Sequence, residues 1–154
     1  MSQVISSNGL LAIWQGNRRL TRRVIEAFPE KELFEFSIGG MRPFAALAKE
    51  LLSIALPGLT EIVESNTAPL MEDFEVHSKA ELLKLWDEAT AGIDTLWPRI
   101  SEERFAETIK LFGQYENSVV DSILYFIENE IHHRGQGYVY LRALDIVPPF
   151  FWER

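Results

Sequence analysis

A histidine, a carboxylate and an amide lie close together on one segment whose apolar residues repeat with helical spacing. At about 100° per residue, Glu130 falls inside the apolar stripe of residues 118–144, and Asn129 and His133 fall at its edge. His132 points almost directly away from that stripe. A buried polar group costs about 1–3 kcal/mol unless it is partnered. We therefore expect these side chains either to form hydrogen bonds in the core or to bind a ligand, and periodicity leaves both alternatives open.

Composition restricts the metal chemistry that such a site could use. The chain has no cysteine and three histidines, so a thiolate zinc site, an iron–sulfur cluster and a catalytic thiol are excluded. A transition-metal site must therefore combine histidine with oxygen ligands. Asn129 and His133 have the i, i+4 spacing with which a helix presents two groups to one metal, although asparagine is a poor ligand. His77 is expected on a surface loop, which leaves one imidazole, that of His133, for the site.

Four segments of about twenty residues carry helical periodicity and would position these side chains. They cover residues 8–28, 43–64, 79–97 and 118–144. Strand signals are almost absent, and the length of 154 residues is that of one domain. The sequence therefore predicts a single all-α four-helix-bundle domain over residues 1–154.

Local signals refine these segments. Ser78 and Glu81 form a capping-box pattern at the start of the third helix. Pro57, followed by glycine, is expected to kink or break the second helix. Residues 106–115 read as irregular or briefly extended, and the apolar tail, residues 148–152, is expected to pack on the body of the protein.

The charge balance argues against a nucleic-acid partner. The 23 acidic residues outnumber the 15 basic ones, for a net charge of −8, whereas a DNA-binding domain needs a basic face. A cluster of four arginines is expected to be a solvated helix face; it comprises Arg18, Arg19, Arg22 and Arg23. Neither a secretory signal nor a membrane-length apolar run is visible, so we expect a cytoplasmic protein without a membrane partner.

The segment Glu128–Arg142, with its His-His-Arg-Gly-Gln run, resembles the signature of the DinB/YfiT-like family of bacterial four-helix bundles. The early residues Asn17–Thr21, the turn Gly39–Phe44 and the closing Ile146–Phe150 also resemble that family, so the similarity covers essentially the whole chain. The resemblance implies an up-up-down-down bundle with longer crossover connections, often a homodimer. It also implies a nickel or zinc site held by three histidines, and relatives that include thiol-dependent S-transferases and a mycothiol-dependent maleylpyruvate isomerase.

Only part of the metal-binding motif that the resemblance implies is present in this sequence. The last family histidine falls on His133, the first member of the H-x-x-x-H pair falls on Asn129, and the second-helix histidine falls on or next to Glu50. Two of the three histidines are therefore replaced. The glycine that the family places near the end of the fourth helix is Asp145 here.

Two interpretations of this site follow. In the first, a weak divalent-metal site persists, with Glu50 and His133 as ligands and with Asn129 or Glu130 and water completing the shell. In the second, the metal site has decayed, and Glu50, Asn129 and His133 form a hydrogen-bonded polar cluster. Both interpretations place a pocket between the second and fourth helices, lined in part by Glu130.

The two interpretations predict different functions. The first predicts a metal-dependent enzyme related to thiol S-transferases or hydrolases, and the second a non-catalytic small-molecule-binding or stress-response interaction protein. Whether the chain is an enzyme, and on which substrate, stays open. Ten phenylalanines and four tryptophans exceed what one small core needs to bury, which favours the homodimer.

Overall fold

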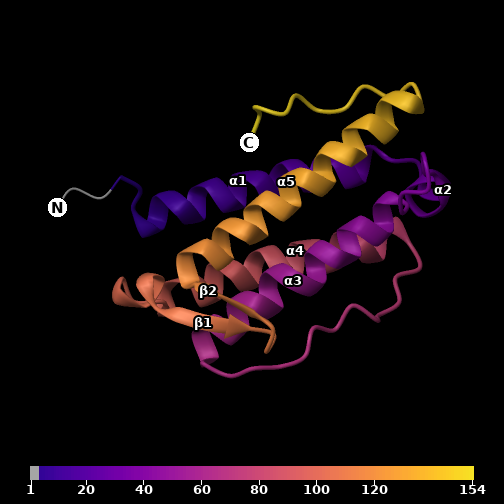
Figure 1. Cartoon of the computed structure of the whole chain (residues 1–154). Helices are drawn as coiled ribbons and strands as arrows, with labels where there is room; N and C mark the ends of the chain where they lie inside the picture. Colours follow the sequence, from indigo (N-terminus) through magenta and orange to yellow (C-terminus); the bar gives the residue numbers. More distant parts are fainter. Residues whose placement is uncertain (1–3) are drawn as a thin grey trace.

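The computed structural model describes residues 4–154, and four long helices dominate it (Figure 1). They are α1 (Ser7–Ala27), α3 (Phe44–Glu64), α4 (Lys79–Leu96) and α5 (Val119–Ala143). Helix α1 packs against α4 and α5, and α3 packs against the same two helices. The four helices therefore enclose a shared apolar core, and the prediction of a mainly helical chain is confirmed.

The helix ends follow from short-range hydrogen bonds. The Ser78 hydroxyl accepts a hydrogen bond from the backbone N–H of Glu81 at 3.1 Å, as the capping-box pattern predicted. The Glu81 carboxylate in turn accepts from the backbone N–H of His77 at 2.9 Å. After α5, Asp145 adopts a left-handed conformation with φ of 59°, which is the conformation that a helix C-terminus commonly requires.

Helix α3 continues through Pro57 and Gly58, so the expected alternative of a broken helix is wrong. Gly58 serves packing, because a Cβ atom there would lie 2.5 Å from Cζ of Phe126 on α5. The glycine thus allows α3 and α5 to approach closely, which brings their polar side chains within reach of each other.

A two-stranded antiparallel hairpin corrects the all-α expectation. Strand β1 (Thr108–Leu111) pairs with β2 (Tyr115–Ser118), with Thr108 opposite Ser118 and Leu111 opposite Tyr115. Phe112 and Gly113 form the turn with φ of 52° and 69°. Each strand has four residues, which is too short to show a reliable alternation of polar and apolar side chains.

Three further short elements connect the long helices and the hairpin. They are the helix α2 (Glu30–Glu35) and the 3₁₀ turns η1 (Trp97–Arg99) and η2 (Glu103–Ala106). Leu33 of α2 is buried in the core, which explains why so short a helix is retained.

The arginine cluster on α1 is not uniformly solvated, which corrects the expectation for Arg18. Arg18 is fully buried, its guanidinium lies 4.0 Å from the centre of the Trp86 ring, and its Nε donates to the Thr90 hydroxyl at 2.8 Å. Arg19 and Arg23 are exposed as expected. Sequence periodicity could not reveal that α4 supplies both a ring and a hydroxyl to this cation.

The C-terminal tail turns back along α5 and α1 (Figure 1), where Glu153 forms a 3.1 Å ion pair with Arg23. Its aromatic side chains nevertheless remain exposed, at 54% for Phe150, 68% for Phe151 and 63% for Trp152. The tail thus lies against the body, as expected, through the buried Pro148 and the ion pair of Glu153, while its aromatic rings stay exposed. No helix within residues 4–154 is long and apolar enough to cross a membrane.

Candidate functional site

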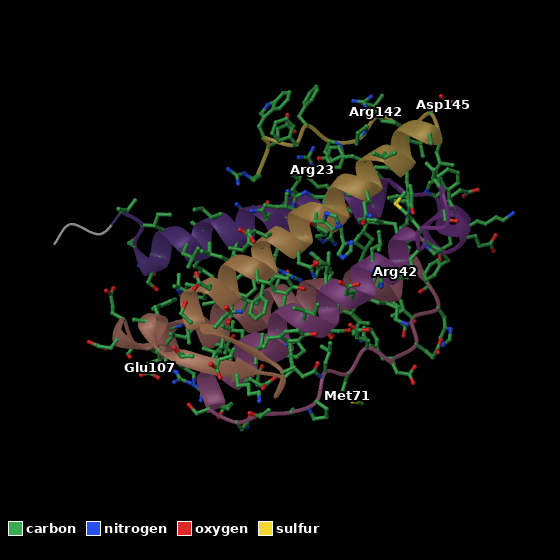
Figure 2. All side chains as sticks on the ribbon, viewed as in Figure 1. Arg23, Arg42, Met71, Glu107, Arg142 and Asp145 are labelled. Carbon is green, nitrogen blue, oxygen red and sulfur yellow. The ribbon has the colours of Figure 1, made fainter. Side chains whose placement is uncertain are left out.

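Glu50 of α3 meets Asn129 and His133 of α5 in a partly buried polar cluster. The His133 Nε2 atom lies 3.0 Å from Glu50 Oε1, and the Asn129 amide donates to the same oxygen at 3.5 Å. The other oxygen, Oε2, accepts from the Arg42 guanidinium at 2.5 Å. Figure 2 labels Arg42 at the start of α3. The structure thus brings together the three positions that the resemblance singled out, and it adds a cation to them.

The His133 ring is held on both nitrogens. While Nε2 faces Glu50, Nδ1 lies 2.7 Å from the side-chain oxygen of Gln136, one turn further along α5. The Gln136 amide nitrogen contacts the sulfur of Met41 at 3.4 Å. A glutamine side chain can offer either its oxygen or its NH₂ group to an imidazole nitrogen. Each ring nitrogen therefore has a partner, and the two contacts together fix the orientation of the ring.

Glu50 is an ionised group in this environment. Burial raises the pKa of the Glu50 carboxyl, but the hydrogen bonds and charges of Arg42 and His133 outweigh that effect and lower the pKa below its usual value. A carboxyl with a lowered pKa is fully charged at neutral pH. The cluster therefore holds a fixed negative charge, not a proton donor, at this position.

A cavity of about 400 Å³ adjoins the cluster and is lined by α3, α5, the hairpin and the long loop before α4. Its volume lies within the range of small-molecule binding sites, about 300–1,000 Å³. Its lining residues are Glu50, Ile54, Leu70, Glu72, Leu111, Phe112, Tyr115, Asn117, Ser122 and Tyr125. Glu50 belongs to both the cavity and the polar cluster, so the cluster fixes one polar wall of the cavity.

Glu130 lies apart from this cluster, on the side of α5 that faces α1. Its carboxylate accepts a 2.6 Å hydrogen bond from the Thr21 hydroxyl and lies 3.7 Å from the Arg18 guanidinium. Arg134 donates to Thr21 at 3.1 Å and to the side-chain oxygen of Asn17 at 2.8 Å. Burial raises the pKa of Glu130, while Arg18, Thr21 and Arg134 oppose that shift. These five residues form a buried network, which we call the α1–α5 network.

The remaining histidines are exposed. His77 lies in the loop before α4, and His132 lies on the outer face of α5, as the sequence indicated. Sequence reasoning missed several members of the site. Gln136 could have been found, because it follows His133 by three residues and so shares its helix face. Arg42 and Glu72 lie outside the periodic segments and carry no such signal.

Comparison with known proteins identifies the family. The sequence profile of the DinB family matches residues 1–152. The chain belongs to the DinB family. A DinB-like protein of Bacillus subtilis is 20% identical, with a TM-score of 0.75 over 94% of this chain and 99% of that one. A DinB-like protein of Bacillus cereus ATCC 10987 is 14% identical, with a TM-score of 0.73 over 94% of this chain and 97% of that one.

At these identities the likeness to the two Bacillus structures establishes the fold alone. A search of curated proteins gives no significant match. The chemistry of this DinB-family chain must therefore be argued from its own residues.

The donor set at the implied DinB-family metal position does not fit nickel or zinc. One imidazole, one carboxylate and one amide stand where the resemblance implies three histidines. The Arg42 guanidinium already neutralises the Glu50 carboxylate, and His133 directs Nε2 at that same carboxylate. Within residues 4–154, no three or more His, Cys, Asp or Glu side chains are grouped so as to hold a metal ion.

Proposed function

We propose that this DinB-family protein binds a small molecule in the cavity beside Glu50, without a catalytic metal. One observation carries the proposal: an apolar-walled cavity of about 400 Å³ has a charged carboxylate on its wall, fixed in place by Arg42 and His133. Ligand sites typically combine apolar walls with a few fixed polar groups. Metal-dependent thiol transfer is the competing function, and the donor set at Glu50, Asn129 and His133 does not support it.

A cavity-filling pair of variants tests this proposal. Asn117 lines the cavity and the neighbouring Glu116 does not, since successive residues of a strand point to opposite faces. A library of small amphipathic molecules would be screened by chemical-shift changes in ¹H–¹⁵N spectra. We expect ligands that shift the amides of Tyr115, Asn117 and Ser122. Asn117→Trp should abolish these shifts, whereas Glu116→Trp should retain them.

Two results would contradict the proposal. One is a set of ligands whose shifts map away from the cavity, and the other is equal binding by the two tryptophan variants. Stoichiometric zinc or nickel in freshly purified, untagged protein would instead support the metal-dependent function.

We further propose that the helices run in an up-down-down-up order with one crossover connection, not in the up-up-down-down order that the resemblance implied. In support, Figure 1 shows α1 and α5 running one way and α3 and α4 the other, and the loop of residues 65–78 crosses the length of the bundle between α3 and α4. We also propose that two copies of the chain form a homodimer. Support comes from exposed apolar side chains near the C-terminus, including Val147 at 75% exposed and Phe151 at 68%, because exposed apolar surface often marks an interface.

A further inference from the structure

We propose that the cavity beside Glu50 selects a positively charged ligand, namely an amine that carries an apolar or aromatic body. This inference rests on the proposed small-molecule function and names its ligand class. It follows from the charges, the aromatic side chains and the apolar wall of the cavity, taken in turn.

Acidic side chains alone supply the formal charges that line the cavity. Glu50 and Glu72 both contribute to the lining, and no lysine, arginine or histidine does. Within residues 4–154, the Glu72 carboxylate forms no hydrogen bond or ion pair, so no cation of these residues lies within ion-pair distance of it. An anionic ligand would meet repulsion here, and a neutral ligand would leave the charge of Glu72 without a counterion.

Arg42 compensates one of these two charges and not the other. Its guanidinium contacts Oε2 of Glu50 and does not line the cavity, and its side chain is 51% exposed. His133 contacts the same carboxylate on Oε1. The charge of Glu50 is therefore largely balanced, while the charge of Glu72 remains available to a ligand. The net charge of −8 on the whole chain also attracts a cationic ligand and repels an anionic one.

Two tyrosines stand beside these carboxylates. Tyr115 and Tyr125 line the cavity and are 53% and 49% exposed. Partial burial raises the pKa of the Tyr125 phenol, and the negative charges of Glu50 and Glu72 contribute to the same rise. The carboxylates of Glu50 and Glu72 thus both lie near enough to the Tyr125 phenol to raise its pKa. Aromatic faces attract cations, so the tyrosines complement an ammonium group instead of opposing it.

The rest of the wall is apolar. It includes Ile54, Leu70, Leu111 and Phe112. A bare metal ion or ammonium ion would gain nothing from this surface, whereas an alkyl or aromatic group would bury apolar area at about 25 cal/mol per Å². The wall therefore favours an amphipathic amine over an inorganic cation.

Three probes of similar size and different charge test the inference: 2-phenylethylamine, 2-phenylethanol and 3-phenylpropanoate. Affinities would be measured by calorimetry on the full chain at low salt. We expect the amine to bind roughly tenfold more tightly than the alcohol, as one charge–charge attraction of about 1.4 kcal/mol would provide. The propanoate should bind most weakly, and the preference should shrink as salt rises.

Matched variants locate the selectivity. Glu72→Gln should remove most of the preference for the amine. Glu75→Gln should retain it, because Glu75 is an exposed acid three residues away that does not line the cavity. Arg42→Gln should strengthen amine binding, since it removes the cation that balances Glu50. A purely structural role for Arg42 would instead weaken the binding of all three probes.

The outcomes separate this inference from the proposed function. Equal binding of the three probes at the cavity, or tighter binding of the propanoate, would overturn the charge selectivity and leave the small-molecule function standing. A preference for the amine that survives in Glu72→Gln would also overturn the assignment. If none of the three probes binds while the library yields ligands that map to the cavity, the inference of an amine ligand fails and the small-molecule function stands.

Discussion

The Glu61 carboxylate, near the end of α3, accepts a hydrogen bond from the backbone N–H of Phe112 at 3.2 Å. Phe112 holds the turn of the hairpin in a left-handed conformation, which is uncommon for a bulky residue, and its side chain lines the cavity. One buried side chain of the bundle therefore fixes the position of a cavity wall. The first prediction tests this link.

Glu61→Ala should lower the free energy of unfolding by about 1–3 kcal/mol, because the buried N–H of Phe112 loses its acceptor. It should also weaken ligand binding, since the hairpin turn is no longer held against α3. Glu61→Gln keeps an acceptor oxygen and serves as the control. Urea unfolding would measure the stabilities, and equal stability of the alanine and glutamine variants would show that the hydrogen bond contributes nothing.

The second prediction concerns the stability of the protein at low pH. Because the pKa of Glu50 is lowered in the folded state, its stabilising effect is present above the ordinary carboxyl value of about 4.3 and is lost as pH falls through the folded pKa. The wild type should therefore be more stable than Glu50→Gln at pH 7, and the difference should shrink below about pH 4. Urea unfolding at several pH values would measure it. A difference that is constant from pH 7 to pH 3 contradicts the assigned charge.

The third prediction separates two glycines of α5. A Cβ atom at Gly137 would lie 2.6 Å from the Phe44 ring, whereas one at Gly135 would meet nothing within 4 Å. Gly137→Ala should therefore destabilise the protein by about 1–3 kcal/mol through overpacking. Gly135→Ala should stabilise it by about 0.5–1 kcal/mol, the usual gain in a helix. Thermal unfolding of both variants is the measurement, and similar shifts in Tm would refute the close packing of α3 on α5.

The fourth prediction concerns metal. Elemental analysis of freshly purified, untagged protein should find no stoichiometric nickel or zinc. The double variant Glu50→His, Asn129→His supplies two more imidazoles beside His133 and should gain zinc binding, detectable by calorimetry. His133→Ala in that background is the control and should lose the gained affinity. Tight zinc binding by the wild type would refute the assignment of Glu50 and His133 to a metal-free cluster.

The fifth prediction concerns the homodimer. Phe151→Ser combined with Trp152→Ser removes exposed apolar surface from the tail and should shift a dimer toward monomer at micromolar concentration. Light scattering coupled to gel filtration would measure the mass. The exposed Val4→Ser, at the other end of the chain, is the control. A wild-type protein that is monomeric at the same concentration would end the dimer proposal.

The sequence predicted what depends on local patterns. Helix periodicity placed the four long helices within one or two residues of their observed ends, and the Ser78 capping box is present. Non-local pairing was not predictable in the same way. The buried state of Arg18 depends on Trp86 and Thr90, which lie about seventy residues away in the sequence.

In the candidate site, too, local patterns could be predicted and non-local pairings could not. Periodicity brought attention to Asn129 and His133, and the family resemblance to Glu50, but the partner of Glu50, Arg42, lies in the turn before α3, outside the periodic segments. Periodicity likewise marked Glu130 as an unusual buried acid without telling which neighbour it faces. Its direction is set by Thr21 and Arg18 across the helix interface, so it joins the α1–α5 network instead of the cavity.

The α1–α5 network has a consequence for how a ligand reaches the cavity. A slip of α5 along α1 would strand Glu130 and Arg134 as unpaired buried charges, at a cost of about 3–5 kcal/mol each. The contact between α1 and α5 should therefore resist small opening motions of the bundle. The opposite side of the cavity is closed by the hairpin and by the loop of residues 65–78, which runs beside α3 and carries Met71 (Figure 2). We therefore expect a ligand to enter between that loop and the hairpin, and we expect the amides of both segments to exchange with solvent earlier than those of α1 and α5.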